Sequence, residues 1–245
     1  MDQTNFQQPL AVEKIAPPTF SSQLSVEEIF YTIQGEGPLS GQPACFIRLA
    51  GCNLQCRMCD SYFSSHVPFS IDQVMSAIEK IVPKHVSLVV VTGGEPFRQY
   101  YMPQLVERLL DRFATVQLET SGSCYQKHFD PIKWQFGNKI MIVCSPKTAK
   151  LHSKIIPLID AYKYVVRAGH IGDDGLPNEE PQHFKKVPVA KPEPNWTGTI
   201  PPIYISPWDE RDVEKNLANV KAAVESCLQH GYVLSLQIHK IVNLP

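Results

Sequence analysis

The stretch that decides how this chain folds is residues 51–60, which reads Gly-Cys-Asn-Leu-Gln-Cys-Arg-Met-Cys-Asp. It places Cys52, Cys56 and Cys59 in a Cys-x3-Cys-x2-Cys spacing. Three thiols this close together do not act as independent core residues, and thiolates at such a spacing converge on a metal ion or an iron–sulfur cluster. Because a closed structural zinc site uses four ligands, three cysteines favour a centre with one open position. The alternative is a zinc knuckle completed by a distant residue such as Cys45 or His66.

The cysteine spacing resembles the cluster motif of the radical S-adenosylmethionine (SAM) enzymes. In that superfamily, three cysteines hold a [4Fe–4S] cluster and SAM occupies the fourth iron. The residue before the third cysteine is usually aromatic there, whereas this chain has Met58, an apolar and adaptable side chain that fills the same gap. The resemblance implies an enzyme, whereas a zinc knuckle implies an interaction module without catalysis.

Composition restricts the possible classes of protein. The chain has 245 residues, of which 43% are hydrophobic, enough for one sizeable domain with a core. The net charge of −1 predicts no nucleic-acid surface, and no apolar run is long enough for a membrane helix. Residues 1–20 lack the pattern of a secretory signal, and seven cysteines are an odd number. Together these features predict a reducing, cytoplasmic location.

Strand-like and helix-like segments alternate along the chain. The predicted strands are 26–33, 44–49, 86–91, 115–118, 139–144, 161–166, 202–205 and 232–238. Strands separated by helices predict parallel βαβ units, and their number is too small for a closed eight-fold barrel. We therefore expect an α/β fold with an incomplete, open parallel barrel. Residues 1–24 are predicted to form an arm, and 25–245 one domain with an irregular insert at 168–200.

The predicted helices have recognisable starts. Ser70 and Gln73 form a capping-box pattern, and Met102-Pro103 opens a second helix. Ser206, followed by Pro207, is the predicted N-cap of the last helix, which Gly231 ends. Its predicted buried face consists of Val213, Leu217, Val220, Val224 and Leu228.

Polar residues recur directly after the predicted strands. They are Cys52, Gly93, Glu95, Glu119, Ser121, Ser145, Lys147 and His239. A single such residue is usually a cap or turn residue, but the carboxyl ends of parallel strands meet at one edge, where sites form. The repeated placement therefore predicts one mouth lined by thiolates, carboxylates, hydroxyls and a lysine. Arg48, in an apolar strand, either reaches water at the strand end or points a guanidinium fork at a carboxylate in the site.

Further motifs narrow the resemblance. Thr92 to Pro96 reads Thr-Gly-Gly-Glu-Pro and resembles the radical SAM motif that receives the amino group of SAM, where glycines permit close backbone approach. Most of the chain is similar to the 7-carboxy-7-deazaguanine synthases of the queuosine and deazapurine pathway. The Gln-Gly-Glu-Gly and terminal Gln-x-His-Lys segments point to that family in particular. The similar stretches are 32–37, 46–52, 59–61, 92–96, 119–122, 145–147 and 236–240.

This resemblance implies roles for individual residues. Cys52, Cys56 and Cys59 would bind the [4Fe–4S] cluster, and Ser61 would bind Mg²⁺, where the family often has Thr. The SAM site would be lined by Gly94, Glu95, Thr120, Ser121, Ser145, Lys147 and Gln237. The substrate, 6-carboxy-5,6,7,8-tetrahydropterin, would be held by Gln34, Glu36, Arg48, His239 and the terminal carboxylate of Pro245.

The resemblance also implies partners. A flavodoxin-type protein would donate the electron, and the chain would form a homodimer. The nearest alternative is another small radical SAM enzyme, such as a glycyl-radical activase, which acts on a protein. A SAM binder that has lost catalysis is a further alternative, against which the complete set of three cysteines speaks. The four other cysteines, Cys45, Cys124, Cys144 and Cys227, are predicted to be packing residues.

Overall fold

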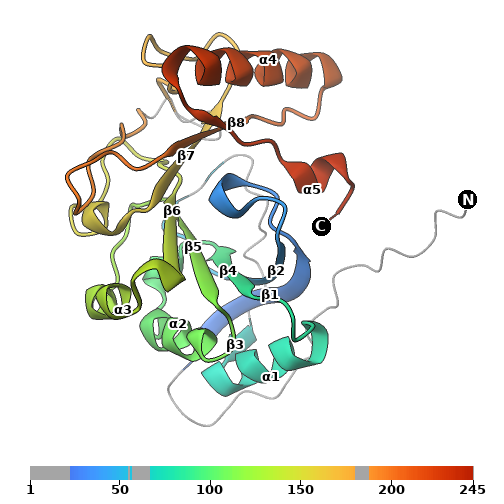
Figure 1. The fold of residues 1–245 in the computed structure, drawn as a ribbon, viewed down its shortest axis with the longest axis vertical. Coiled ribbons are helices and arrows are strands. Elements are labelled where there is room, and N and C mark those ends of the chain that lie inside the picture. The colour runs from blue at the N-terminus through green and yellow to red at the C-terminus, as the bar shows by residue number, and fades with distance from the viewer. Residues whose placement is uncertain (1–22, 55, 57–66, 180–187, 245) are drawn as a thin grey trace, which may run out of the picture.

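The computed structural model describes residues 23–54, 56, 67–179 and 188–244. The strands in these residues form one sheet, in the order β3-β1-β2-β4-β5-β6-β7-β8-β9, which curves without closing (Figure 1). Its strands are β1 (Leu24–Ile33), β2 (Pro43–Leu49), β3 (Val67–Phe69), β4 (Leu88–Gly93), β5 (Thr115–Thr120), β6 (Ile140–Cys144), β7 (Ala161–Val166), β8 (Ile203–Pro207) and β9 (Val233–Leu234). The predicted open α/β architecture is therefore confirmed.

The alternating pattern predicts a parallel sheet, but the sheet is parallel only in part. From β2 to β9, each neighbouring pair runs parallel, but β1 pairs antiparallel with both β2 and β3. Only residues 34–42 connect β1 to β2. This connection is a tight hairpin because a parallel crossover needs a dozen or more residues.

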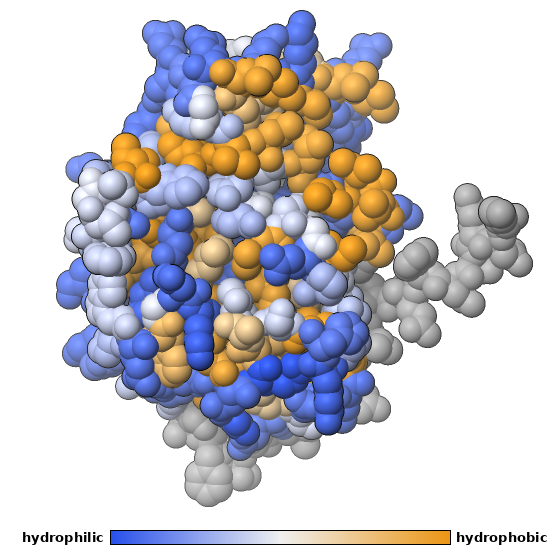
Figure 2. Space-filling model, in the orientation of Figure 1, coloured by the Kyte–Doolittle hydropathy of each residue, from blue (hydrophilic) through white to orange (hydrophobic). Residues whose placement is uncertain are grey.

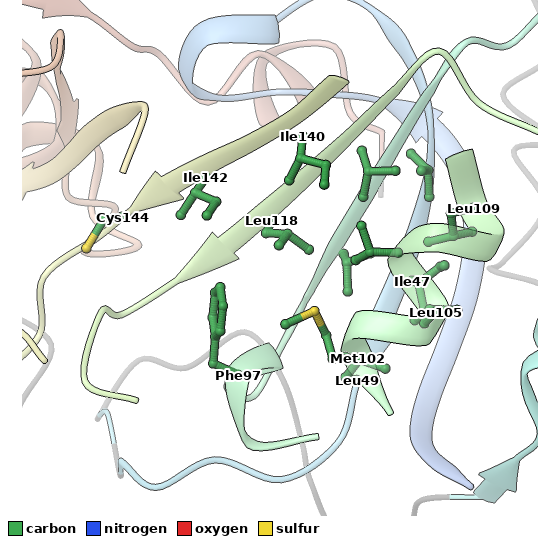
Figure 3. Packing of buried hydrophobic residues seen from close by; sticks show 14 of the residues in the cluster. Ile47, Leu49, Phe97, Met102, Leu105, Leu109, Leu118, Ile140, Ile142 and Cys144 are labelled. Atoms are coloured by element: carbon green, nitrogen blue, oxygen red, sulfur yellow. The ribbon is translucent and has the colours of Figure 1, made fainter. Parts of the chain in front are cut away.

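Helices pack against the outer, convex face of the sheet (Figure 1). They are α1 (Ile71–Ile81), α2 (Met102–Leu110), α3 (Phe129–Phe136) and α4 (Val213–His230). The short α5 (Ile238–Ile241) does not belong to this layer, and its His239 packs on Gly35 in the β1–β2 connection. The main core lies between this face and the helices. In Figure 3, Ile47, Leu118 and Ile142 from the sheet face Leu105 and Leu109 of α2. Every second strand residue thus contributes to one apolar layer.

The predicted start of α1 is confirmed in detail. The Ser70 hydroxyl accepts a hydrogen bond from the Gln73 backbone N–H at 3.2 Å, and the Gln73 side chain accepts one from the Ser70 N–H at 2.9 Å. Val74 and Ile78 lie on the buried face of this helix. Local capping chemistry was sufficient to place this helix.

The predicted start of α4 is wrong, and three of the five residues of its predicted buried face are exposed, while Val220 and Val224 are half-buried. Ser206 and Pro207 extend β8 by pairing with β7, and the N-cap is Asp212, whose side chain accepts from the Lys215 N–H at 3.1 Å. Val213, Leu217 and Leu228 are 77%, 66% and 82% exposed.

The helix packs instead through small and polar residues. Asn219 is buried and donates to the backbone carbonyl of Trp208, and the Ser226 hydroxyl donates to that of Gly175 at 2.6 Å. Ala223 and Cys227 join the main core. Hydrogen bonds to neighbouring loops determine which face of this helix packs against the rest of the protein. The spacing of hydrophobic residues carries no information about such bonds.

The C-terminal segment also differs from its prediction. The predicted strand 232–238 is reduced to the two residues of β9, and α5 follows. His239 therefore lies on a helix rather than directly after a strand. In the described parts of 168–200, there are two isolated bridges but no helix or strand. No helix within the described residues is both long and apolar enough to span a bilayer.

Candidate active site

The end of β4 lies directly against the chain that leads into the cysteine loop. The Gly94 N–H donates to the Leu49 carbonyl at 2.8 Å, and the Glu95 N–H donates to the Gly51 carbonyl at 3.0 Å. A Cβ atom at Gly94 would lie 2.0 Å from the Gly51 carbonyl oxygen, so only glycine fits there. The two motifs are thus joined through their backbones.

Glu95 is the anchor between β4 and β5. Its carboxylate is fully buried and accepts hydrogen bonds from the Thr120 hydroxyl at 2.7 Å, the Ser121 hydroxyl at 2.6 Å and the Ser121 N–H at 2.9 Å. A fourth bond comes from the Phe97 N–H at 3.2 Å. Burial raises the pKa of Glu95, and the hydrogen bonds act in the opposite direction. Thr120 and Ser121 therefore hold the Gly-Gly-Glu turn through Glu95.

Two of the three motif cysteines fall within the described residues. Cys52 and Cys56 are half-buried after the end of β2. Asn53, beside Cys52, donates to the Ser123 hydroxyl at 2.9 Å, which ties the loop to the segment after β5. The predictions for Cys59, Ser61 and Pro245 fall on residues outside the described ranges. The cysteine loop after β2 and the glycine turn after β4 lie side by side at one edge of the sheet. This arrangement suits a cluster held by the thiols with a ligand beside it on the glycine backbone.

Ser145 and Lys147 follow β6 at the same edge of the sheet. The Ser145 N–H donates to the Thr120 carbonyl at 2.7 Å, which places this segment beside the anchor of Glu95. Both side chains are half-buried. The structure therefore gathers the predicted SAM residues from β4, β5 and β6, with the exception of Gln237.

A second group of polar residues lies on the inner, concave face of the sheet, with Glu119 at its centre. One carboxylate oxygen of Glu119 accepts from Gln34 and Gln117, each at 3.1 Å. The other accepts from the Thr92 hydroxyl at 3.0 Å. Since Glu119 immediately precedes Thr120 in β5, it connects the inner group to the predicted SAM residues.

Glu36 is the second carboxylate of this inner group, and its N–H donates to the Gln34 side chain at 3.1 Å. Lys163 of β7 donates to one of its carboxylate oxygens, and Gln237 donates to the other at 2.6 Å. Burial raises the pKa of Glu36, but the charge and hydrogen bond of Lys163, the bond from Gln237 and the nearby His239 lower it to about 2. Glu36 is therefore ionised, and Gln237 lies with the predicted substrate residues.

His239 and Arg48 each contact residues near the inner face. A Cβ atom on Gly35 would lie 1.9 Å from His239 Nδ1, so the imidazole packs directly on this glycine. Arg48 donates to Glu28 at 2.5 Å, with its guanidinium 5.6 Å from the ring centre of Phe30. Arg48 thus lies half-buried on the inner face, paired with a carboxylate of the protein itself.

Sequence reasoning placed Glu119 at the mouth without giving it a role, and it did not name Thr92, Gln117 or Lys163 as site residues. A signal was available for Lys163, because a lysine between two tyrosines in an otherwise apolar strand must point away from the core. Two buried polar atoms, Gln117 Oε1 and Ser206 Oγ, have no hydrogen-bond partner among the described residues. Such atoms suit a polar ligand on this face.

Comparison with known proteins agrees with this geometry. Residues 46–133 match the family described as the radical SAM superfamily. The chain is 40% identical to a 7-carboxy-7-deazaguanine synthase of Rhodospirillum rubrum over 93% of this chain and 95% of that protein. It is 34% identical to the synthase of Rickettsia prowazekii, over 91% and 89%. A crystal structure of QueE from Escherichia coli is similar in fold, with a TM-score of 0.58 and 20% identity, covering 89% of this chain and 95% of that one.

Proposed function

The chain belongs to the 7-carboxy-7-deazaguanine synthase family of the radical SAM superfamily, and from this premise we propose that it converts 6-carboxy-5,6,7,8-tetrahydropterin to 7-carboxy-7-deazaguanine, with loss of ammonia. The observation that carries this proposal is the position of Glu119, which joins the inner polar group to the motif residues at the strand ends. A substrate on the inner face would therefore lie beside the cofactor.

Cys52, Cys56 and Cys59 hold the [4Fe–4S] cluster, and the backbone of Gly94 accommodates SAM. When bound, the cluster and SAM supply a radical that removes a hydrogen atom from the substrate. The protein orients the cofactor: Glu95, Thr120 and Ser121 fix the Gly-Gly-Glu turn through buried hydrogen bonds. Ser145 and Lys147 bind the carboxylate or ribose of SAM from the next strand.

Gln34, Glu36, Arg48, His239 and Pro245 would hold the pterin. An ionised, buried carboxylate such as Glu36 binds the N–H donors of an amino-pyrimidine edge strongly, because charged hydrogen bonds exceed neutral ones. Arg48 lies on the same inner face, where its guanidinium binds the substrate carboxylate in addition to Glu28 or in its place. Ser61 would supply a hydroxyl ligand to Mg²⁺, since a hard cation accepts hydroxyl oxygens and water.

We further propose that a flavodoxin-type protein reduces the cluster in the cytoplasm, and that residues 25–245 form one domain that dimerises. Support for a homodimer comes from apolar residues on one face of α4, Val213, Leu217 and Leu228, which are exposed. Figure 2 shows apolar surface over α4 and near α5. A second copy covering this face would remove it from water. Replacing Leu217 and Leu228 by Lys should then give monomers in light scattering, whereas an unchanged mass would exclude this surface.

The activity is tested with anaerobically reconstituted protein, SAM, a reductant, Mg²⁺ and 6-carboxytetrahydropterin, with 7-carboxy-7-deazaguanine as the readout. Cys56→Ala should abolish product and reduce the iron content, because the cluster loses a ligand. Cys227→Ala is the matched control, since Cys227 lies on α4 in the main core and should leave turnover unchanged.

Three other outcomes separate the alternatives. SAM cleavage without pterin turnover would indicate a different radical SAM enzyme, such as an activase with a protein substrate. A colourless protein that contains zinc and no iron would indicate an interaction module. Iron and bound SAM with no cleavage of SAM would indicate a binder without catalysis.

A further inference from the structure

Lys163 is an unusual residue for a parallel strand in the middle of a sheet. It lies in β7 between Tyr162 and Tyr164, which are fully buried on the helix-covered face. Alternation along the strand turns Lys163 to the inner face, where its side chain is 12% exposed. A lysine so buried needs a partner of opposite charge.

That partner is Glu36, whose side chain is 17% exposed. Lys163 donates to Glu36 Oε2, and Gln237 donates to Glu36 Oε1 at 2.6 Å. The two donors come from different parts of the chain, so the carboxylate is held from two sides. Two bonds to its two oxygens fix both its position and its plane.

The backbone around Glu36 is also held by the C-terminal segment. The Gly37 N–H donates to the Ser235 hydroxyl at 2.9 Å, and the Ile238 N–H donates to the Gly35 carbonyl at 3.1 Å. These bonds fix the loop, but they do not determine where the Glu36 side chain points. Among the described residues, Lys163 is the donor to Glu36 that lies on a strand of the sheet.

The charges that act on Glu36 are those of Lys163 and, more weakly, His239. Burial alone raises the pKa of Glu36, so the carboxylate depends on its partners to remain ionised. Without Lys163, burial and the Gln237 bond remain, and the pKa rises. Lys163 therefore affects both the orientation and the charge of Glu36.

We propose that Lys163 is a positioning residue that acts through Glu36, holding this carboxylate ionised and aimed at the N–H donors of the pterin. The inference rests on the proposed function, because it requires a substrate with an amino-pyrimidine edge on the inner face. It adds to that function a strand residue that does not itself contact the reacting atoms.

The test compares four variants of the reconstituted holoenzyme: Lys163→Met, Lys163→Arg, Glu36→Gln and the double variant Lys163→Met/Glu36→Gln. Lys163→Met should raise KM for the pterin about tenfold or more, as expected when a charged hydrogen bond is disturbed. KM for SAM should not change. Lys163→Arg should restore most of the affinity because it keeps the charge.

The pH profile supplies a readout that a merely structural lysine would not affect. In Lys163→Met, kcat/KM should fall as pH decreases, because Glu36 becomes protonated at a higher pH than in the unaltered enzyme. Glu36→Gln and the double variant should have equal KM values, since Lys163 acts only through Glu36. This last comparison holds even if Lys163→Met alone folds poorly.

Fluorescence titration with 6-carboxypterin measures the binding affinity of the same four variants without turnover. This measurement does not depend on the cluster. Lys191→Met is the matched control, because Lys191 forms an exposed ion pair with Asp174, and it should behave like the unaltered protein.

The two proposals fail in different ways. If the unaltered protein neither binds the pterin nor forms product, the proposed function is wrong and the inference falls with it. If the unaltered protein does both, but Lys163→Met keeps its KM, titration and pH profile, only the role of Lys163 is wrong. A KM that differs between Glu36→Gln and the double variant would also overturn that role.

Discussion

Strand β5 presents Val116 and Leu118 to the helix-covered face of the sheet and Gln117 and Glu119 to the opposite, inner face. Gln117 and Leu118 are both fully buried, although they are neighbours with opposite chemistry. The outer face is stabilised by apolar packing, which needs no particular partner. Around β5, the inner face is held by directed hydrogen bonds, and the Gln117 Oε1 atom there has no partner among the described residues.

This difference separates residues that stabilise the fold from residues that hold a ligand. Strand β7 repeats it, with Tyr162 and Tyr164 on the outer face and Lys163 on the inner one. A change on the outer face should therefore lower stability and leave substrate affinity unchanged. A change on the inner face should lower substrate affinity and leave stability nearly unchanged.

The largest expected effect is that of Leu118→Ala on the outer face. Leu118 is fully buried beneath α2, and its truncation should lower the free energy of unfolding by about 3 kcal/mol. Urea unfolding measures this change. Ile200→Ala, at an exposed position, is the control and should stay within about 0.5 kcal/mol. Equal losses for the two variants would contradict the packing described here.

Lys133→Met tests a buried lysine on the helix-covered side. Lys133 donates to both carboxylate oxygens of Asp160, at 2.9 and 2.7 Å, and to the Ile140 carbonyl. Its loss should lower the free energy of unfolding by about 2 kcal/mol, because Asp160 is left partly buried without its counter-charge. KM for the pterin should not change, in contrast to Lys163→Met. A raised KM for the pterin in Lys133→Met would contradict the claim that residues on the helix-covered side do not affect substrate binding.

Gln117→Leu should change the free energy of unfolding by less than about 1 kcal/mol, because the substitution removes a buried oxygen that has no described partner. It also removes one of the hydrogen bonds to Glu119, so pterin affinity should fall. Unfolding and pterin titration on the same preparation measure both effects. A large loss of stability with unchanged affinity would assign Gln117 to the fold instead.

The last prediction concerns how Glu36 makes the free energy of unfolding depend on pH. Its folded pKa of about 2 lies below the ordinary value of 4.5, so its contribution to stability is complete above pH 4.5 and is lost as pH falls toward 2. Glu36→Gln should therefore flatten the pH dependence of unfolding in that window and leave its slope unchanged between pH 5 and 7. A difference in slope above pH 5 would show that Glu36 is not held in this way.

Much of this arrangement could be predicted from local patterns. The cysteine spacing and the Gly-Gly-Glu-Pro turn indicated the superfamily, and the capping box placed α1. Errors arose where distant contacts decided the outcome. The hydrophobic pattern predicted the wrong face of α4 because Asn219 and Ser226 dock it by hydrogen bonds to the Trp208 and Gly175 carbonyls. The contact of Gln237 with Glu36 likewise joins segments far apart in the chain.

The sequence by itself determined which residues carry the chemistry and which strands they follow, because motif spacing and strand periodicity are local properties. Only the tertiary structure decided which of these residues meet. Glu36 and Lys163 are far apart in the chain, and they pair because the curved sheet brings the β1–β2 hairpin opposite β7. Contacts of this kind depend on how the sheet curves and on which face each strand presents, and no single segment of the chain contains that information.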